Sequence, residues 1–517
     1  MQSESIKTLQ FLGRPQQCIL PIFQRKYSWE KNDECKVLLK DLEYVGNEDT
    51  RYNWYLGAIV CQNTGGNLAR PVFVLIDGQQ RLTTITILLC ALTEYLRKHP
   101  KTKLDEVKNW DSLLKTYVIN SEEEGDKWYR LLLNNEDKED LKELIYKVSV
   151  GEEIPKYKGN STVFNNYHFF KRHINKNNIE AVYNGLKKLE MIHISLDEHD
   201  VAQNIFETLN STGKSLQNID QIRNYLLMGL ESNEAEDIYH HYWRPMEISF
   251  EDHKIGKTNH FDFFARYYLI LKLGVSVRTD GVYDKFRMVS DNFENATTCI
   301  KELKQFSDYY LRLFADCEED PILKKEFKEY QVVGMRNFSP FLMKMYQKYD
   351  LNEISKKDVV SIINLLKSYH LRKSICGWPN NGLEQVGLKL IKNLEDGGLN
   401  EIVKSMLDLK GANRFVSDLQ VKENIPFQNF ESYTRLKFVL NKLVNFDKSA
   451  PIDTSELSVK KICPDVSEEY AIKLGNFTLE GIDLCMDIEA ETNEEFIDKR
   501  TEALTDLILK VWEYPSL

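Results

Sequence analysis

The chain has 517 residues, more than one hydrophobic core usually serves, so we expect two or three domains. Apolar residues make up 42% and aromatic residues 11% of the chain, which excludes disorder over most of its length. The formal net charge of −11 argues against unspecific coating of nucleic acid, which needs clustered Lys and Arg.

The first part of the chain, up to about residue 98, predicts an α/β arrangement. Strand candidates are the apolar runs 17–23, 54–60 and 72–76, and the last of these is rich in β-branched residues. The stretch 63–67, Asn-Thr-Gly-Gly-Asn, predicts a hairpin loop between the second and third strands. After Arg81, apolar residues recur at the spacing of one helix face.

The rest of the chain is mostly helical in pattern. Residues from about 99 to 190 predict a charged helical insertion with a break at 151–159. Residues 191–196 predict another strand, and residues 200–230 predict a helix, a loop and a second helix. Beyond residue 231 the pattern is helical and rich in aromatic residues, and a last helix ends near Trp512.

The cysteines and the absence of sorting signals bear on the compartment. The nine cysteines form no Cys-x-x-Cys pair, which is typical of reduced thiols and not of a disulfide framework or a zinc site. The N-terminal residues lack the pattern of a signal peptide, and no stretch approaches the roughly 18 apolar residues of a bilayer span. We therefore expect a cytoplasmic protein.

A polar run, Asp77–Arg81, follows the third strand candidate and opens the predicted helix. Helix N-termini present free N–H groups and a positive dipole end, which suit phosphate. Gly78 would let a ligand approach the backbone, and Arg81 offers a fork of donors. Asp77 could hold a metal ion or orient a water with help from the two glutamines. The alternative is a polar turn in which Thr83 caps the helix.

A second polar and aromatic stretch covers residues 21–29. Gln24 and Arg25 offer hydrogen bonds and positive charge, while Tyr27 and Trp29 could stack on a base. The alternative, which this stretch alone favours, is an amphipathic surface turn with its two aromatic side chains anchored in the core.

A third stretch, Phe206–Leu216, places a glycine-bearing loop between two predicted helices. Its Gly213-Lys214-Ser215 is similar to the end of a phosphate-binding loop. However, Thr208 replaces the upstream glycine and no strand precedes the stretch, which excludes a Walker-type loop. The remaining functional interpretation is a second wall of the same pocket, with Asn210 and Lys214 facing a nucleotide. The alternative, favoured by this stretch alone, is a capped helix–helix turn.

Searches for other chemistry find little. The ten histidines form no His-x-x-x-His or His-Glu-x-x-His pattern, and there is no Gly-x-Ser-x-Gly. The sequence therefore indicates no dedicated metal site and no serine nucleophile.

Several of these motifs occur in a collinear order that resembles a known family. They are Leu20–Trp29, Tyr55–Gly57, Ile76–Thr84, and Ile205–Gly213 followed by Asp220 and Arg223-Asn224. This order resembles the GmrS-type domain, the ParB/sulfiredoxin-like half of the GmrSD type IV restriction enzymes and of the phosphorothioation-linked defence protein SspE. The resemblance covers about residues 1–230, and Ser368–Gly377 is similar more loosely.

The resemblance implies a domain that hydrolyses a nucleoside triphosphate, with Mg²⁺ as a candidate cofactor. It leaves the choice among GTP, ATP, CTP and UTP open. The implied catalytic residues are Asp77, Gln79, Gln80 and Arg81. Together with the motifs above, the expected nucleotide-binding residues are Gln24, Arg25, Tyr27, Trp29, Gly78, Thr83, Thr84, Asn210, Gly213 and Lys214.

The family's C-terminal nuclease segment, the GmrD type, carries a Glu-His-Ile-x-Pro core followed by Leu-Gly-Asn-Leu-Thr-Leu. This chain keeps the second motif as Leu474–Leu479, but Lys460 and Lys461 stand where the Glu and the catalytic His belong. A protonated Lys cannot activate water unless its pKa is strongly depressed. We therefore expect a degenerate HNH-like module without nuclease activity, in which Lys460, Lys461 and Asn476 contact DNA or a partner. For the Lys pair, a solvated surface turn is an equal alternative.

The predicted fold class is α+β. It combines a ParB/sulfiredoxin-like α/β domain at 1–230, a helical domain at 231–430 and a mainly helical module at 431–517. The leading hypothesis is a prokaryotic antiviral-defence protein that couples nucleoside triphosphate hydrolysis to DNA, such as modified phage DNA, or to a nuclease-bearing partner. No membrane is expected, and homo-oligomers are left open. The alternatives are an active modification-dependent DNA endonuclease and a non-enzymatic module that senses nucleotide or binds DNA.

Overall fold

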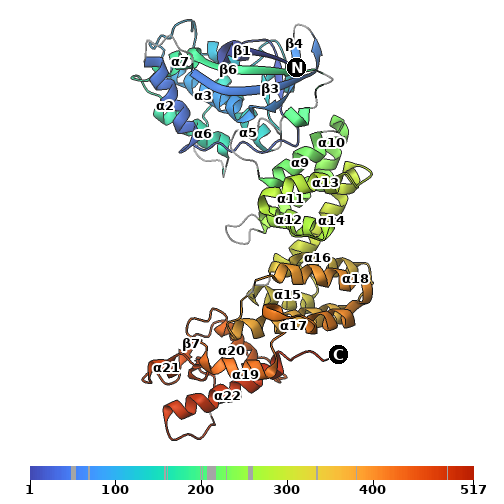
Figure 1. The fold of residues 1–517 in the computed structure, drawn as a ribbon. Helices are drawn as coiled ribbons and strands as arrows, with labels where there is room; N and C mark the ends of the chain where they lie inside the picture. Colours follow the sequence, from blue (N-terminus) through green and yellow to red (C-terminus); the bar gives the residue numbers. More distant parts are fainter. Residues whose placement is uncertain are drawn as a thin grey trace. The chain divides into compact units, whose positions relative to one another are not determined.

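The chain forms two compact units, Met1–His240 and His241–Leu517 (Figure 1). This computed structural model describes residues 1–47, 54–67, 70–134, 136–155, 159, 161–197, 200, 202–205, 217–228, 230–253, 260–333, 336–379, 381–485 and 487–516. Helices dominate, and the strands gather mainly in the first unit, which confirms the α+β class. The predicted division of the chain at residues 230 and 430 stays a prediction.

A six-stranded mixed sheet forms the frame of the first unit, with the order β1-β6-β3-β4-β2-β5. Its strands are β1 (Gln2–Lys7), β2 (Gln17–Ile19), β3 (Trp54–Asn67), β4 (Arg70–Asp77), β5 (Leu131–Leu132) and β6 (Leu189–Leu196). β4 lies between β3, to which it is antiparallel, and β2, to which it is parallel. β2 pairs with β4 only as far as Val74, while β3 pairs with it as far as Asp77, so β3 is the strand that supports the following turn.

Two predicted strand boundaries are wrong. The expected hairpin loop at 63–67 belongs to β3, which pairs with β4 as far as Asn67, opposite Arg70. A register shift between Asn63 and Gly65 accommodates the extra residue there, as β-bulges do. β2 ends at Ile19 and does not reach residue 23, since Pro21 has no N–H to donate to a ladder.

The first unit also contains nine α-helices among its described residues. They are α1 (Thr8–Leu12), α2 (Glu34–Asn47), α3 (Gln79–Lys98), α4 (Ser112–Tyr117), α5 (Glu136–Val150), α6 (Thr162–His173), α7 (Ile179–Lys188), α9 (Asn218–Met228) and α10 (Ser232–Ile238). α3 packs against α4, α5 and α6, and nearly all of its side chains are buried. The predicted helix after the third strand is confirmed as α3. The helices α4, α5, α6 and α7 lie within residues 99–190, and their interpretation as an insertion stays a prediction.

The described residues of the second unit are mainly helical and include a small antiparallel ladder. Its helices are α11 (Arg244–Asp252), α12 (His260–Leu273), α13 (Val282–Ser290), α14 (Ala296–Phe314), α15 (Pro321–Val333), α16 (Ser339–Asp350), α17 (Lys356–Ile375), α18 (Leu383–Leu407), α19 (Asp418–Asn424), α20 (Leu436–Val444), α21 (Glu468–Ala471) and α22 (Asn493–Val511). The ladder pairs β7 (Val459–Lys461) with β8 (Phe477–Leu479). Short 3-10 helices η6 (Ile425–Phe427) and η7 (Leu474–Asn476) flank these elements.

Two further expectations concern the whole chain. All nine cysteines are free thiols, and most of them are buried. Among the helices that the structure describes, none has the length and apolar character that a membrane crossing requires.

Candidate functional site

The turn between β4 and α3 is built around Gly78. This residue has a φ of 94°, in the left-handed region that favours glycine. A Cβ at this position would lie 2.7 Å from Cγ1 of Ile59 on β3, so space also excludes a side chain. α3 begins at Gln79, and Gly78 has no side chain to cap it. Thr83 is buried one turn inside the helix, so the alternative in which Thr83 caps the helix is wrong. The first N–H groups of α3 thus have no capping side chain from Gly78.

Asp77 and Arg81 form an ion pair across this turn. Nη1 of Arg81 lies 3.6 Å from Oδ2 of Asp77 and donates a hydrogen bond of 2.9 Å to the carbonyl of Ala58. The guanidinium lies against Gly57, where a Cβ would approach its Nε to 2.7 Å. The two side chains keep 24% and 27% of their surface exposed. The pair is therefore oriented by β3 and still reachable from solvent.

Two buried glutamines hold the loop at 21–29 against this turn. Nε2 of Gln24 donates to the carbonyl of Ile76 at 2.9 Å. Oε1 of Gln80 accepts from the N–H of Ser28 at 2.8 Å, and its Nε2 donates to the carbonyl of Lys26 at 3.2 Å. Both the oxygen and the nitrogen of the Gln80 amide are hydrogen-bonded to backbone groups of the loop, so this side chain holds the loop in position. Its predicted catalytic role has no direct support in these contacts.

Tyr27 anchors the same loop in the core. Its hydroxyl hydrogen-bonds with Oγ1 of Thr84 at 2.6 Å and accepts from Nδ2 of Asn166 at 2.9 Å. Burial raises the pKa of Tyr27 well above its usual value. The expectation that Tyr27 stacks on a base is therefore corrected, and the alternative of a core anchor fits it. Trp29 is partly buried against the same core.

Residues far along the chain complete the support of this loop. On α5, Oδ2 of Asp137 accepts from the N–H of Tyr27 at 2.7 Å. On α6, Asn166 also donates to the carbonyl of Trp29 at 2.7 Å. The sequence contained no signal for Asp137 or Asn166, because they lie more than 100 positions away in a charged helical stretch. On α9, Nε of the buried Arg223 donates to the carbonyl of Phe23 at 2.7 Å.

Several polar atoms on or next to the residues of these contacts are buried and lack a hydrogen-bond partner among the described residues. They are Nε of Arg25, Oγ of Ser28, Oε1 of Gln79, Oδ1 of Asn166 and Oδ1 of Asn224. Arg25 and Asn224 directly follow residues that hold the loop, and Gln79 directly follows Gly78. Because buried polar groups in proteins are almost always hydrogen-bonded, these atoms represent hydrogen-bonding capacity that the described residues leave unused.

The comparison with known families adds to this geometry. The model of the family described as GmrSD restriction endonuclease, N-terminal domain, matches residues 8–227. This region is a GmrSD-type N-terminal domain. A search of curated proteins finds no match to the chain. The match assigns residues 8–227 to the N-terminal domain of a restriction-system family, and it spans the 21–29 loop, the β4–α3 turn and most of α9.

Three predicted residues of the GmrSD-type domain, Asn210, Gly213 and Lys214, lie outside the described residues. Just after them, Arg223 pairs with Asp220 at 2.9 Å. In the described part of the chain, no three His, Cys, Asp or Glu side chains gather as a metal site. Mg²⁺ is commonly bound by one or two carboxylates and by substrate phosphates, and Asp77 offers one such carboxylate.

The C-terminal motif is arranged differently. Lys460 on β7 pairs with Glu480, and Lys461 pairs with Glu431 at 2.8 Å. Asn476 is fully buried, and its Oδ1 accepts from the N–H of Cys463 at 2.9 Å. Its Nδ2 donates to the carbonyls of Cys463 and Ala471, at 3.1 and 3.4 Å. The predicted contact of Asn476 with DNA or a partner is therefore corrected: this side chain closes the turn before β8.

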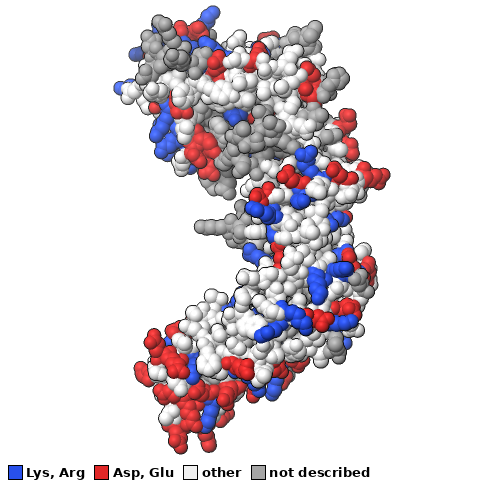
Figure 2. All heavy atoms as spheres, viewed as in Figure 1, with Lys and Arg blue, Asp and Glu red and all other residues white. Residues whose placement is uncertain are grey.

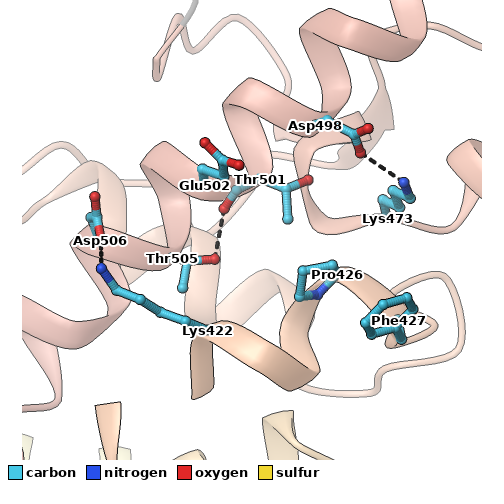
Figure 3. A pocket seen from close by; sticks show the side chains of 9 residues that line it. All are labelled: Lys422, Pro426, Phe427, Lys473, Asp498, Thr501, Glu502, Thr505 and Asp506. Carbon is cyan, nitrogen blue, oxygen red and sulfur yellow. Dashed lines mark hydrogen bonds and ion pairs between the residues drawn. The ribbon is translucent and has the colours of Figure 1, made fainter. Parts of the chain in front are cut away.

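A pocket of about 500 Å³ lies between α22 and the α19–η6 segment (Figure 3). Its two lysines are already paired: Lys422 with Asp506 at 2.9 Å, and Lys473 with Asp498 at 2.7 Å. Phe427 is 84% exposed on the opposite wall. Paired lysines give this pocket little attraction for phosphate.

Acidic side chains dominate the last part of the second unit. Residues 431–517 contain 18 Asp and Glu against 10 Lys and Arg, a net charge of −8 within the chain's −11. Many of these carboxylates gather on the surface over α21 and α22 (Figure 2). Such a surface repels the phosphates of DNA.

Proposed function

We propose that the GmrSD-type domain binds and hydrolyses a nucleoside triphosphate at the β4–α3 turn, and that hydrolysis controls an effector in phage defence. One observation carries the proposal. The partly exposed Asp77–Arg81 pair stands at the start of a 20-residue helix, and among the described residues Nε of Arg25 and Oε1 of Gln79 are buried without a hydrogen-bond partner. Donors at a helix N-terminus suit phosphate oxygens, and an unbonded acceptor suits a water or a sugar hydroxyl.

Each of these residues has a role that its contacts support. Arg81 would bind phosphate oxygens, and its hydrogen bond to Ala58 holds the guanidinium in place before the ligand arrives. Arg25 would add a second cation from the 21–29 loop. Asp77 would hold Mg²⁺ or accept a proton from the attacking water, and Oε1 of Gln79 would orient that water. Mg²⁺, when bound, would neutralise charge on the phosphates.

Four other predicted residues act in this proposal through the loop. Gln24, Gln80, Tyr27 and Thr84 are buried and bonded to backbone or to one another. They would fix the position of Arg25 relative to the turn. Their substitution should weaken nucleotide binding more than it slows the chemical step.

Phosphate release with GTP, ATP, CTP and UTP tests the proposal. Arg81→Ala and Asp77→Ala should each lower the rate by about 100-fold or more, the usual loss when a group that stabilises the transition state is removed. Arg14→Ala is the matched control, since Arg14 pairs with Glu4 at 2.9 Å on the exposed side of β1. Hydrolysis that survives both site substitutions, or that falls equally in the control, contradicts the assignment.

The effector is proposed to be a separate, nuclease-bearing protein. The net charge of −8 over residues 431–517 and the engaged side chains of Lys460, Lys461 and Asn476 favour a protein partner over DNA at this module. The test is incubation of the purified chain with modified phage DNA and a divalent metal. Nicking by the chain alone would support the alternative of an active modification-dependent endonuclease.

A further inference from the structure

A second group of unbonded polar atoms lies at the C-terminal end of α17 in the second unit. His370 is 2% exposed, and neither of its ring nitrogens has a hydrogen-bond partner among the described residues. Nε of Arg435, just before α20, is also buried without a hydrogen-bond partner among the described residues. His370 belongs to the stretch Ser368–Gly377, which the proposed nucleotide chemistry does not use.

The same place holds cations that no carboxylate balances. Lys373 is fully buried, and in the described part of the chain its Nζ donates to oxygens of neutral groups, the carbonyl of Ala412 at 2.9 Å and Oδ1 of Asn413 at 3.4 Å, and lies 5.4 Å from the centre of the Tyr369 ring. Nη1 of Arg435 donates to the hydroxyl of Ser374 at 3.0 Å. In the described chain, neither Lys373 nor Arg435 forms an ion pair.

Other buried cations on α17 show the usual arrangement. Lys367, also buried, donates to Glu326 at 2.5 Å and to Glu329 at 2.7 Å. The fully buried Arg372 pairs with Asp418 at 2.7 Å. Buried charges in proteins are normally paired in this way, because leaving one unpaired is costly. Lys373 and Arg435 have no such carboxylate partners among the described residues, so the positive charge around them is not balanced.

The pKa of His370 is consistent with unbalanced positive charge next to its ring. Burial, together with the positive charges of Arg435 and Lys373, lowers the pKa of His370 to about 4. Burial also lowers the pKa of Lys373. His370, Lys373 and Ser374 stand at positions i, i+3 and i+4, so they share one face of the helix.

We propose that His370, Lys373, Ser374 and Arg435 form a binding site for a phosphate-sized oxyanion, separate from the nucleotide site of the first unit. A phosphate can accept hydrogen bonds from an ammonium, a guanidinium, a hydroxyl and a ring N–H together. Ser374 and Arg435 are partly exposed and give the site its opening. The net charge of −8 over residues 431–517 disfavours a DNA chain, so the site is assigned to a small ligand, inorganic phosphate or the phosphate of a mononucleotide.

Isothermal titration of the full chain with sodium phosphate, at ionic strength held constant with chloride, tests the site. The protein carries Arg81→Ala, so that the proposed nucleotide site contributes little. Phosphate should bind saturably, and Arg435→Gln should weaken binding about tenfold or more, the loss expected for a charge-assisted hydrogen bond. Arg414→Gln is the matched control, because this exposed arginine stacks on Trp378, 4.6 Å away, just beyond the same helix.

A second readout locates the ligand. Phosphate should raise the pKa of His370 from about 4 towards its ordinary value, since a bound anion offsets Arg435 and Lys373. Histidine-ring NMR measures this shift, and the signal is assigned by its loss in His370→Asn. If Arg435→Gln does not fold, His370→Asn replaces it as the variant in which phosphate binding should be weakened.

Parallel titrations with AMP and with a 5′-phosphorylated oligonucleotide distinguish the sources of the phosphate. Binding of phosphate or AMP that moves the His370 signal supports the site and names its ligand. Absence of binding, an unmoved His370 signal, or equal binding by Arg435→Gln would overturn it. Tighter binding of the oligonucleotide than of either small ligand would overturn the assignment to a small ligand.

Discussion

The β4–α3 turn of the first unit and the β7–β8 connection of the second are both rich in polar side chains, but these are used differently. At the first, Asp77 and Arg81 remain partly exposed, and Oε1 of Gln79 is unbonded among the described residues. At the second, the amide of Asn476 is bonded at both ends and Lys460 pairs with Glu480. Polar composition alone therefore does not identify a binding site. A binding site is better indicated by buried polar atoms that lack hydrogen-bond partners and lie next to a strand or helix that holds them in place.

The largest effect should come from Gly57→Ala at the first turn. The added Cβ would meet Nε of Arg81 at 2.7 Å, and the φ of 125° disfavours any side chain. Displacing the guanidinium should slow phosphate release about 100-fold, as misplacement of a catalytic group typically does. Gly65→Ala on the same strand is the control, because a Cβ there meets nothing within 4 Å. Equal activity of the two variants would show that Arg81 need not be held by β3.

A large structural effect is expected from Asn476→Ala at the second connection. The substitution leaves the backbone groups of Cys463 without partners, which should cost about 1–3 kcal/mol of local stability. Hydrogen exchange of residues 459–479 measures the change. The exposed Asn493→Ala serves as control. Unchanged protection, combined with lost binding of DNA or a partner protein, would restore a functional role for Asn476.

A smaller effect should follow from Gln80→Ala. This substitution tests whether Gln80 positions the 21–29 loop or takes part in the chemical step. Loss of the bonds to Ser28 and Lys26 loosens the loop that carries Arg25, so KM for the nucleotide should rise about tenfold with kcat little changed. Steady-state kinetics measure both constants, and Gln10→Ala, at an exposed position on α1, is the control. A fall in kcat as large as that of Arg81→Ala would mean that Gln80 touches the reacting groups.

The smallest effect is expected from Lys460→Ala combined with Lys461→Ala. Both pairs lie at the surface, where ion pairs contribute about 0–1 kcal/mol. Hydrogen exchange in β7 and phosphate release by the first unit should stay close to wild type. Loss of DNA binding by this double variant, measured by fluorescence anisotropy, would instead assign DNA contacts to the lysine pair.

Local patterns predicted the elements of the first unit well where the signal is itself local. The β-branched run at 72–76 and the apolar spacing after Arg81 correspond to β4 and α3. The hairpin was placed wrongly because a bulge let β3 continue through two glycines, and pairing across strands decides that outcome. The role of Tyr27 was also mistaken, since an aromatic ring looks the same in sequence whether it faces a ligand or the core.

The sequence by itself determined the α+β class, the strand–turn–helix around Gly78 and the GmrSD-type motifs of the first unit. These features depend on residue type and short spacing. The tertiary structure decided which polar side chains are engaged and which are free. Gln24 meets Ile76, Asn166 meets Trp29 and Arg223 meets Phe23 over 52, 137 and 200 positions of the chain. No local pattern encodes such pairings, because a hydrogen bond depends on where the fold places its two partners.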